Sequence, residues 1–351
     1  MRKVRLGIIG CGVIGTAHLH ATRDCDFIDV VAVADLIAER RERAAAACGT
    51  ATAFASGAAL LESPQVEAVV LAVPAGDRIE LPLQAMARGK HVLIEKPVAL
   101  NTAMLEKYQQ AQGALVAGCC SSRFQTLPST QAAADVIASG VLGPLRNIHC
   151  RVLVPSKVDP AAPPIPWRLN KERNAGGILC NWGCYDLDYL MAITGWSLCP
   201  RMVMAQTWGV TPAVAPYVAP HSDAESFYTA FIRFDGGTVL TLTRGEYMAI
   251  SGEAAWQVIG EHGSLRLHMT PDAGKTIYHD TYTPPTGVTT RVVWEGSEDG
   301  GLLHSGPVQD FARAILDGTS PRTDLQRVMT LQRITDAIYA SAALGSSVEL
   351  P

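Results

Sequence analysis

The 351-residue chain lacks any long block of like charge. Its 29 basic and 33 acidic residues are dispersed along the sequence and give a net charge of −4. Proteins that bind nucleic acid or an anionic membrane through charge concentrate basic residues on one face, so neither partner is expected here. A small, neutral or modestly charged molecule is the expected ligand.

No apolar run approaches the roughly 20 residues that a membrane span requires. The basic start at 1–5 and the apolar stretch at 6–11 mimic a secretion signal. A signal core needs roughly 7–15 apolar residues, so this stretch is too short. We therefore expect a cytoplasmic protein.

The nine cysteines are scattered without the spacing of a small disulfide scaffold, which favours reduced thiols. Cys180 and Cys184 have no second His or Cys pair at the spacing of a four-ligand site, so no metal is predicted. Repeats and low-complexity segments are also missing. The length, with 48% hydrophobic residues, predicts two domains.

Buried-strand patterns alternate with helical patterns through residues 1–122, which predicts a doubly wound parallel sheet. Residues 123–351 contain short β runs separated by glycine-rich turns and two closing helices, which predicts a second α/β domain with a large, mostly antiparallel sheet. A proline-rich loop is expected at 155–166. The predicted strands of the first domain are 4–9, 30–34, 66–73, 92–94 and 115–118, its helices are 16–23, 37–47, 81–88 and 102–112, and the closing helices are 308–316 and 325–343.

The first predicted strand leads into the turn Gly10-Cys11-Gly12-Val13-Ile14-Gly15. In this spacing the first glycine allows the turn, the second lets the backbone approach a pyrophosphate, and the third permits close helix packing. Asp35 lies 20 residues after Gly15, where a carboxylate accepts hydrogen bonds from ribose hydroxyls. A dinucleotide site is therefore predicted. The charge of Asp35 favours NAD over NADP, although the arginines at 40, 41 and 43 oppose this preference.

A lysine follows the strand 92–94 in the tripeptide Glu95-Lys96-Pro97. Ligands of open parallel sheets bind outside the carboxyl ends of the strands, so this lysine is expected to face a cofactor or substrate. Together with other motifs, the tripeptide resembles the Gfo/Idh/MocA family of oxidoreductases over nearly the whole chain. The motifs that carry the resemblance are the glycine turn, Asp35, Ala72-Val73-Pro74, the segment 89–97, Trp167-Arg168, Gly176-Gly177 and the entry to the last helix at 321–324.

The resemblance implies an NAD(P)-dependent dehydrogenase or reductase acting on CH–OH groups. It also implies an amino-terminal Rossmann domain and a carboxyl-terminal domain whose open sheet builds homodimers or homotetramers. Lys96 corresponds to the family's active-site lysine, which contacts the substrate hydroxyl and shares in proton transfer. The second family signature has an aspartate and a histidine where this chain has Asn181 and Tyr185.

A phenol beside an ammonium group has a lowered pKa, so Tyr185 and Lys96 are predicted to handle the proton together. Asn181 can orient a hydroxyl but cannot take a proton. The predicted cofactor contacts are Gly10, Gly12, Val13, Ile14, Gly15, Asp35, Ala72, Pro74, Glu95, Lys96, Trp167 and Arg168. The predicted substrate contacts are Lys96, Arg123, Arg168, Asn181 and Tyr185.

The predicted reaction moves a hydride between NAD(H) and a carbinol or ketone of a sugar, cyclitol or related polyol. Two alternatives stay open: an NAD-dependent glycosidase or lyase that uses transient oxidation, and a non-catalytic sensor of dinucleotide and sugar. His18 is expected to be buried against the sheet and His304 to lie in a loop. Asp186 is expected near the pocket with Arg123 and Asn181, whereas the alternating polarity at Asp186 and Asp188 is also typical of a solvated helix edge.

Overall fold

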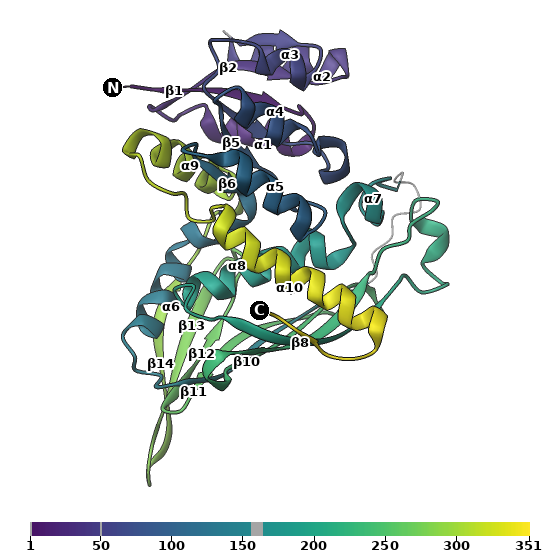
Figure 1. The fold of residues 1–351 in the computed structure, drawn as a ribbon. Helices are drawn as coiled ribbons and strands as arrows, with labels where there is room; N and C mark the ends of the chain where they lie inside the picture. The colour runs from purple at the N-terminus through teal and green to yellow at the C-terminus, as the bar shows by residue number, and fades with distance from the viewer. Residues whose placement is uncertain (1, 50, 156–163) are drawn as a thin grey trace. The chain divides into compact units, whose positions relative to one another are not determined.

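A computed structural model describes residues 2–49, 51–155 and 164–351 (Figure 1). The chain folds into two compact units. Unit 1 contains residues 1–123 and 301–329, and unit 2 contains residues 124–300 and 330–351. The two domains predicted from the sequence, 1–122 and 123–351, stay predictions, but the segment 301–329 packs with the first unit.

Unit 1 is built on a six-stranded parallel sheet with the order β3-β2-β1-β4-β5-β6. The order reverses between β1 and β4, and such a switch point is where open α/β sheets bind ligands. The predicted doubly wound parallel sheet is confirmed. Its strands are β1 (Val4–Ile9), β2 (Ile28–Ala34), β3 (Thr52–Phe54), β4 (Ala68–Leu71), β5 (His91–Ile94) and β6 (Ala117–Cys119).

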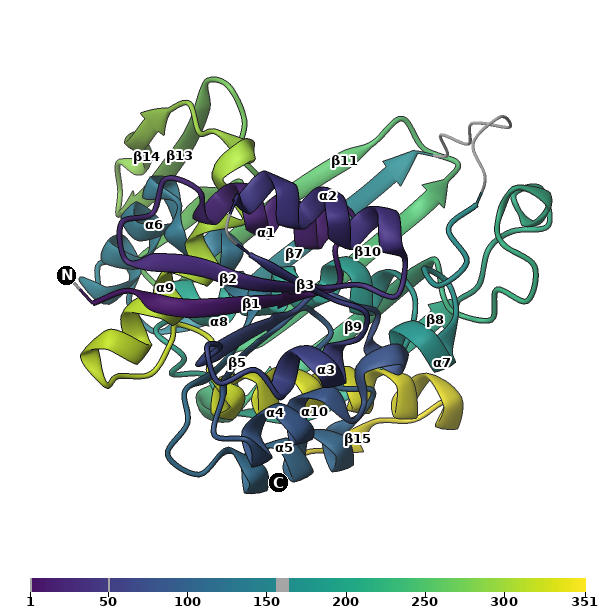
Figure 2. The same cartoon turned by 90° about the horizontal axis from the view of Figure 1, so that it is seen from above.

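Helices cover both faces of this sheet (Figure 2). The helices α1 (Val13–Thr22) and α2 (Ala38–Cys48) cover one face, where Ile8 packs with Leu19. The opposite face is covered by α3 (Gly57–Leu61), α4 (Leu81–Ala87) and α5 (Thr102–Gln112).

Two elements far along the chain complete the unit 1 core. Helix α9 (Ser305–Asp317) buries Val308 and Phe311 against β1. The first turn of α10 (Leu325–Leu344) adds Leu325 to the core on the other face. Both helices were expected to close the second domain. The pattern predicted the helices themselves, but periodicity does not identify the sheet on which a helix packs.

Unit 2 is built on a nine-stranded sheet with the order β14-β13-β12-β11-β7-β10-β9-β8-β15. Its pairs are antiparallel except β7 with β10, which confirms the prediction of a large, mostly antiparallel sheet. The strands are β7 (Leu145–Pro155), β8 (Pro200–Trp208), β9 (Phe227–Phe234), β10 (Val239–Met248), β11 (Glu253–Gly260), β12 (Gly263–Leu267), β13 (Lys275–Thr283), β14 (Gly287–Gly296) and β15 (Val348–Glu349).

Helices α6 (Pro128–Ala138) and α8 (Cys184–Ile193) lie on one face of the nine-stranded sheet (Figure 1). Along β9 the residues that face these helices, such as Ile232, are buried. On the other face Phe231 is 41% exposed beside Met204 of β8, which is 48% exposed. This face therefore keeps apolar side chains in contact with solvent.

Shorter helical elements connect these parts. They are η1 (Ala75–Arg78), η2 (Cys120–Thr126), α7 (Lys171–Asn174), the π-helical turn η3 (Leu179–Gly183), η4 (Ala215–Tyr217), η5 (Asp235–Gly237) and η6 (Gly300–Leu302). None of the helices in the described part of the chain is long and apolar enough to cross a membrane. The predicted loop 155–166 falls mostly outside the described residues.

Candidate active site

The glycine turn between β1 and α1 has room for a ligand at one glycine only. A Cβ at Gly10 would lie 2.6 Å from Val73 Cγ1, and one at Gly15 would lie 1.7 Å from the carbonyl oxygen of Gly10. The space around a Cβ at Gly12 is open to at least 4 Å. The first N–H groups of a helix have no acceptor within it, so the start of α1 at Val13 and Ile14 offers donors to a phosphate.

Asp35 ties the second strand to this turn. Its Oδ2 accepts a hydrogen bond from the Cys11 backbone N–H at 2.8 Å, and its Oδ1 accepts one from the Ile37 N–H at 2.8 Å. Each carboxylate oxygen has a second lone pair, which suits a ribose hydroxyl. Arg41 Nη1 lies 3.4 Å from the Asp35 carbonyl oxygen, so a cation shares this corner.

The turn after β4 supplies two further predicted cofactor positions of unit 1. Ala72 donates its N–H to the carbonyl oxygen of Ile9 at 2.8 Å, and Pro74 begins the turn η1. The glycine turn, Asp35 and this segment therefore meet at the switch point of the sheet. These residues fit a dinucleotide.

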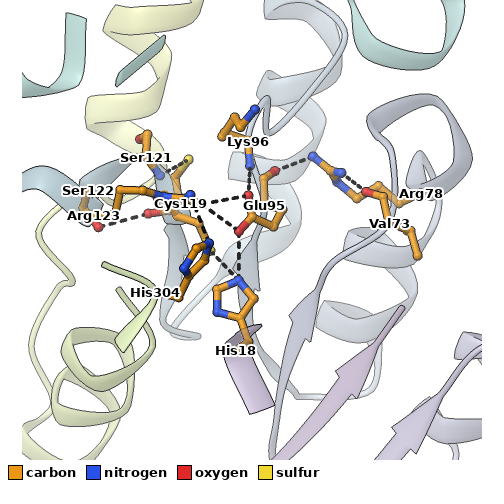
Figure 3. A network of polar contacts seen from close by, with 11 residues as sticks. His18, Val73, Arg78, Glu95, Lys96, Cys119, Ser121, Ser122, Arg123 and His304 are labelled. Atoms are coloured by element: carbon orange, nitrogen blue, oxygen red, sulfur yellow. Dashed lines mark hydrogen bonds and ion pairs between the residues drawn. The ribbon is translucent and has the colours of Figure 1, made fainter. Parts of the chain in front are cut away.

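Glu95 has a buried carboxylate at the end of β5 (Figure 3). Its Oε1 accepts from His18 Nε2 at 2.8 Å and lies 3.1 Å from Arg123 Nη2, while its Oε2 accepts from the Lys96 backbone N–H at 3.1 Å. Burial alone raises the pKa of Glu95, but Arg123 and the His18 hydrogen bond outweigh burial and hold this pKa well below its usual range. Glu95 is therefore an anion with several partners.

Arg123 extends this cluster to His304, which directly precedes α9. Arg123 Nη1 lies 3.2 Å from His304 Nε2, and Arg123 itself is 8% exposed. A guanidinium only donates, so His304 Nε2 accepts and carries no proton. Burial, with the Arg123 charge added, lowers the pKa of His304 to about 4. His18 is fully buried, as expected.

Arg78 is a site residue that sequence reasoning missed. It is 1% exposed and donates to the backbone carbonyl oxygens of Val73, Glu95 and Pro97, which joins the ends of β4 and β5. Its single sequence signal is an arginine inside the η1 turn after Pro74. That signal is weak, because an arginine in a loop is usually solvated.

In the described part of the chain, His18, Glu95 and Cys120 form the one group of possible metal donors, with ligand atoms within 4.8 Å of one another. The Arg123 guanidinium already neutralises the carboxylate, and His18 already donates to it. Burial raises the pKa of the Cys120 thiol well above its usual value, which disfavours the thiolate that a metal needs. This donor set therefore does not favour a cation.

Tyr185 of α8 packs inside an aromatic cluster of unit 2. Its ring centroid lies 5.4 Å from Phe124 and 5.7 Å from Trp182, both edge to face, and the residue is 4% exposed. The guanidinium of Arg244 lies 4.9 Å from the Trp182 ring centroid. These contacts fix the orientation of the Tyr185 ring.

Asn181 and Arg168, which are both predicted to contact the substrate, lie next to each other in unit 2. Asn181 sits in the π-helical turn, and its Nδ2 donates to the Arg168 carbonyl oxygen at 3.1 Å. The Arg168 guanidinium pairs with the buried carboxylate of Glu246, a partner that the sequence did not reveal. Trp167 is partly exposed. Lys96 belongs to unit 1, whereas Asn181 and Tyr185 belong to unit 2.

The pair Gly176-Gly177 is required by close packing. A Cβ at Gly177 would lie 1.8 Å from the Glu225 carbonyl oxygen, and one at Gly176 would lie 1.8 Å from Tyr339 Oη. The Glu225 carboxylate accepts from the backbone N–H groups of Gly177 and Leu179, at 3.0 and 2.9 Å. Glu225 thereby anchors the start of the π-helical turn that carries Asn181.

A solvated helix edge, the alternative given for Asp186 and Asp188, is wrong. Both are fully buried. Asp186 forms a two-bond ion pair with Arg244, at 2.5 and 3.0 Å, and Asp188 accepts from Gln125 at 2.5 Å. Their spacing suggested a solvated edge, but α8 is buried on several sides and its polar groups find partners in neighbouring elements.

The fold and the site together define an α/β oxidoreductase that binds a dinucleotide. A sequence profile described as "Oxidoreductase family, NAD-binding Rossmann fold" matches residues 4–115, and the "GFO/IDH/MocA C-terminal domain" profile matches residues 130–266. The chain belongs to the Gfo/Idh/MocA family. The expected enzyme class, an NAD(P)-dependent dehydrogenase or reductase acting on CH–OH groups, is thereby confirmed.

The chain is 26% identical to D-xylose 1-dehydrogenase (NADP(+)) 2 of Haloferax volcanii, over 98% of this chain and 99% of that protein. It is 33% identical to inositol 2-dehydrogenase of Ralstonia nicotianae over 44% of this chain and 48% of that protein. A solved levoglucosan dehydrogenase in complex with NADH and levoglucosan has a TM-score of 0.86 at 20% identity, covering 100% of both chains. The fold is therefore shared along the whole chain.

Proposed function

We propose that the protein transfers a hydride between NAD(H) and a carbinol or ketone of a sugar, cyclitol or related polyol. The observation that carries the proposal is the open corner at Gly12 and Asp35, at the same edge of the parallel sheet as Lys96, which follows β5. The named relatives that act on xylose and inositol support a polyhydroxylated substrate.

NAD is the proposed cofactor, and it supplies the hydride acceptor or donor when bound. Asp35 would accept from the ribose hydroxyls, and its negative charge disfavours the extra phosphate of NADP. Arg41 lies at the same corner and is the residue that could reverse this preference. Comparing kcat/KM for NAD and NADP tests the proposal, and Asp35→Ala should shift the ratio toward NADP.

Lys96 and Tyr185 are proposed to handle the proton of the reacting hydroxyl. Oxidation of a carbinol leaves a carbonyl, so the hydroxyl proton must pass to a positioned base. Asn181 is proposed to orient a substrate hydroxyl, because its amide can both donate and accept a hydrogen bond but cannot take the proton. Arg168 is proposed to hold a substrate oxygen, and Trp167 is proposed to contact the cofactor.

The test is a screen of aldoses, inositols and anhydro sugars with NAD, following reduced nicotinamide and product together. Lys96→Ala and Tyr185→Phe should each lower turnover of the accepted substrate by about 10²–10⁴-fold. The exposed Lys107→Ala and Tyr217→Phe are matched controls and should leave turnover unchanged. Near-normal turnover in both site variants would refute the proton-transfer assignment.

The same screen separates the two alternatives. Bond cleavage without accumulated NADH would indicate a glycosidase or lyase that uses transient oxidation. Binding of both ligands without turnover would indicate a sensor.

The open face of the nine-stranded sheet is proposed to build a homodimer or homotetramer. Its exposed Phe231 and Met204 are cross-strand neighbours, and apolar patches of this kind mark interaction surfaces. Phe231→Glu should convert the assembly to monomers in sedimentation experiments. Arg233→Glu on the same strand is the control, because it adds a negative charge without removing an apolar side chain. A wild-type monomer at high protein concentration would contradict the proposal.

A further inference from the structure

The turn that carries Lys96 is held from two sides. On one side, the Glu95 carboxylate accepts the Lys96 backbone N–H at 3.1 Å and is itself bound by His18 and Arg123. On the other side, Arg78 donates to the backbone carbonyl oxygens of Glu95 and Pro97, the residues that flank Lys96. The backbone around Lys96 is therefore held from both sides by buried charged groups.

The charges of this cluster depend on one another. Arg78 is 1% exposed and Arg123 is 8% exposed, and the Glu95 carboxylate lies among them. Burial lowers the pKa of Arg78, and the negative charge of Glu95 acts against that shift. Buried charges without a partner are costly, so loss of Glu95 would leave two guanidinium groups poorly compensated.

Groups of the protein itself donate the hydrogen bonds that the Glu95 carboxylate accepts. Its Oε1 already meets two donors, His18 at 2.8 Å and Arg123 at 3.1 Å, which matches the two lone pairs of a carboxylate oxygen. Its Oε2 meets the Lys96 N–H, with Arg123 Nη2 at 3.5 Å. The Lys96 side chain extends away from this carboxylate (Figure 3).

We propose that Glu95 is a positioning residue for Lys96 and not a cofactor contact, and that Arg123 and His18 act through it. The inference rests on the role proposed above for Lys96, and it replaces the sequence-based assignment of Glu95 to the cofactor. It also gives Arg123 a role inside the protein in place of the predicted substrate contact. A displacement of about 1 Å at a reacting group can cost about 100-fold in rate, so such support matters.

The first test does not depend on activity. Hydrogen exchange of the peptide spanning Lys96 reports the backbone N–H that Glu95 accepts, because exchange requires local opening. Glu95→Gln and Arg123→Met should accelerate this exchange by about tenfold in the NAD-free enzyme. Unchanged exchange in both variants would overturn the proposal, whatever the role of Lys96.

The second test asks whether Glu95 acts through Lys96. In the otherwise wild-type enzyme, Glu95→Gln should lower kcat about 30-fold and leave the dissociation constant of NAD within about twofold. In a Lys96→Ala background the same change should lower the residual rate less than about twofold. An equal loss in both backgrounds, or weakened NAD binding with unchanged kcat, would contradict the inference.

Arg123 variants distinguish positioning from simple destabilisation. Arg123→Lys keeps the charge and should recover most of the kcat that Arg123→Met loses. The control is Glu298→Gln, which removes a comparably buried carboxylate from its ion pair with Lys275 in unit 2. This control should change stability but neither the Lys96 exchange nor kcat. If Lys96→Ala itself keeps normal turnover, the role proposed for Lys96 fails, while the exchange experiment still decides the role of Glu95.

Discussion

The two residues proposed to move the proton are held by different forces. Lys96 lies on a turn fixed by charged groups. The Glu95 carboxylate accepts from His18 and Arg123, and the Arg78 guanidinium donates to the backbone carbonyl oxygen of Glu95. Tyr185 lies among aromatic rings on α8, and the π-helical turn before α8 follows a close contact between Gly177 and the Glu225 backbone. Electrostatic support depends on pH, whereas packing depends on volume, so the two regions should fail under different perturbations.

The largest expected effect comes from adding a methyl group at Gly177, before the helix that carries Tyr185. Gly177→Ala places a Cβ 1.8 Å from the Glu225 carbonyl oxygen, a backbone atom that cannot turn aside. We expect a loss of at least about 3 kcal/mol in the free energy of unfolding. Denaturant titration measures it. Gly209→Ala, where the Cβ meets open space, is the control and should change stability little.

An intermediate effect is expected at the glycine turn of unit 1. Gly12→Ala should keep stability within about 1 kcal/mol, because nothing lies near the new Cβ. It should weaken NAD binding about tenfold or more by occupying the space of the phosphates. Calorimetric titration with NAD gives the affinity.

Gly15→Ala provides the matched comparison, because its Cβ would lie 1.7 Å from the Gly10 carbonyl oxygen. It should reduce stability as well as binding. Equal NAD affinity in Gly12→Ala and wild type would show that the open space is not the phosphate site.

The smallest expected effect concerns pH and the charge-held region. The pKa of His304 falls from its usual 6.5 to about 4 in the folded protein, so the unfolded chain binds the proton first as pH drops. Stability should therefore decrease as pH falls from 6.5 toward 4. The slope should be well under the ~1.4 kcal/mol per pH unit that one proton can carry, because His304 is partly exposed.

His304→Gln removes this titration and should flatten the slope in denaturant titrations across that window. Gly177→Ala should shift stability by a similar amount at each pH. If His304→Gln leaves the slope unchanged, another group dominates the pH dependence of unit 1.

The sequence predicted helices and strands well where the periodicity of apolar residues was strong. The strand Val4–Ile9 and the helix Thr102–Gln112 have the predicted bounds, and Gly49 ends α2 as expected. Helix α1 begins at Val13, three residues before the predicted start, because Gly12 already serves as its N-cap. The elements β3 and α3 were missed, since three and five residues carry too little periodicity.

The partners of the site residues could not be predicted from the sequence. Motif spacing predicted roles for Lys96 and Asp35, but the bonds of Glu95 to His18 and Arg123 join residues 77 and 28 positions apart. The buried pair of Asp186 with Arg244 spans 58 positions. Such contacts follow from tertiary packing, which a helical pattern of charges does not encode.

The place of α9 in the unit 1 core has a consequence for biosynthesis. Phe311 and Val308 pack on β1, so the cofactor-binding half gains part of its core only after more than 300 residues have left the ribosome. Domains often fold in the order in which they are made, but this unit must wait for α9. A nascent chain stopped after β6 should therefore stay an incomplete, protease-sensitive intermediate.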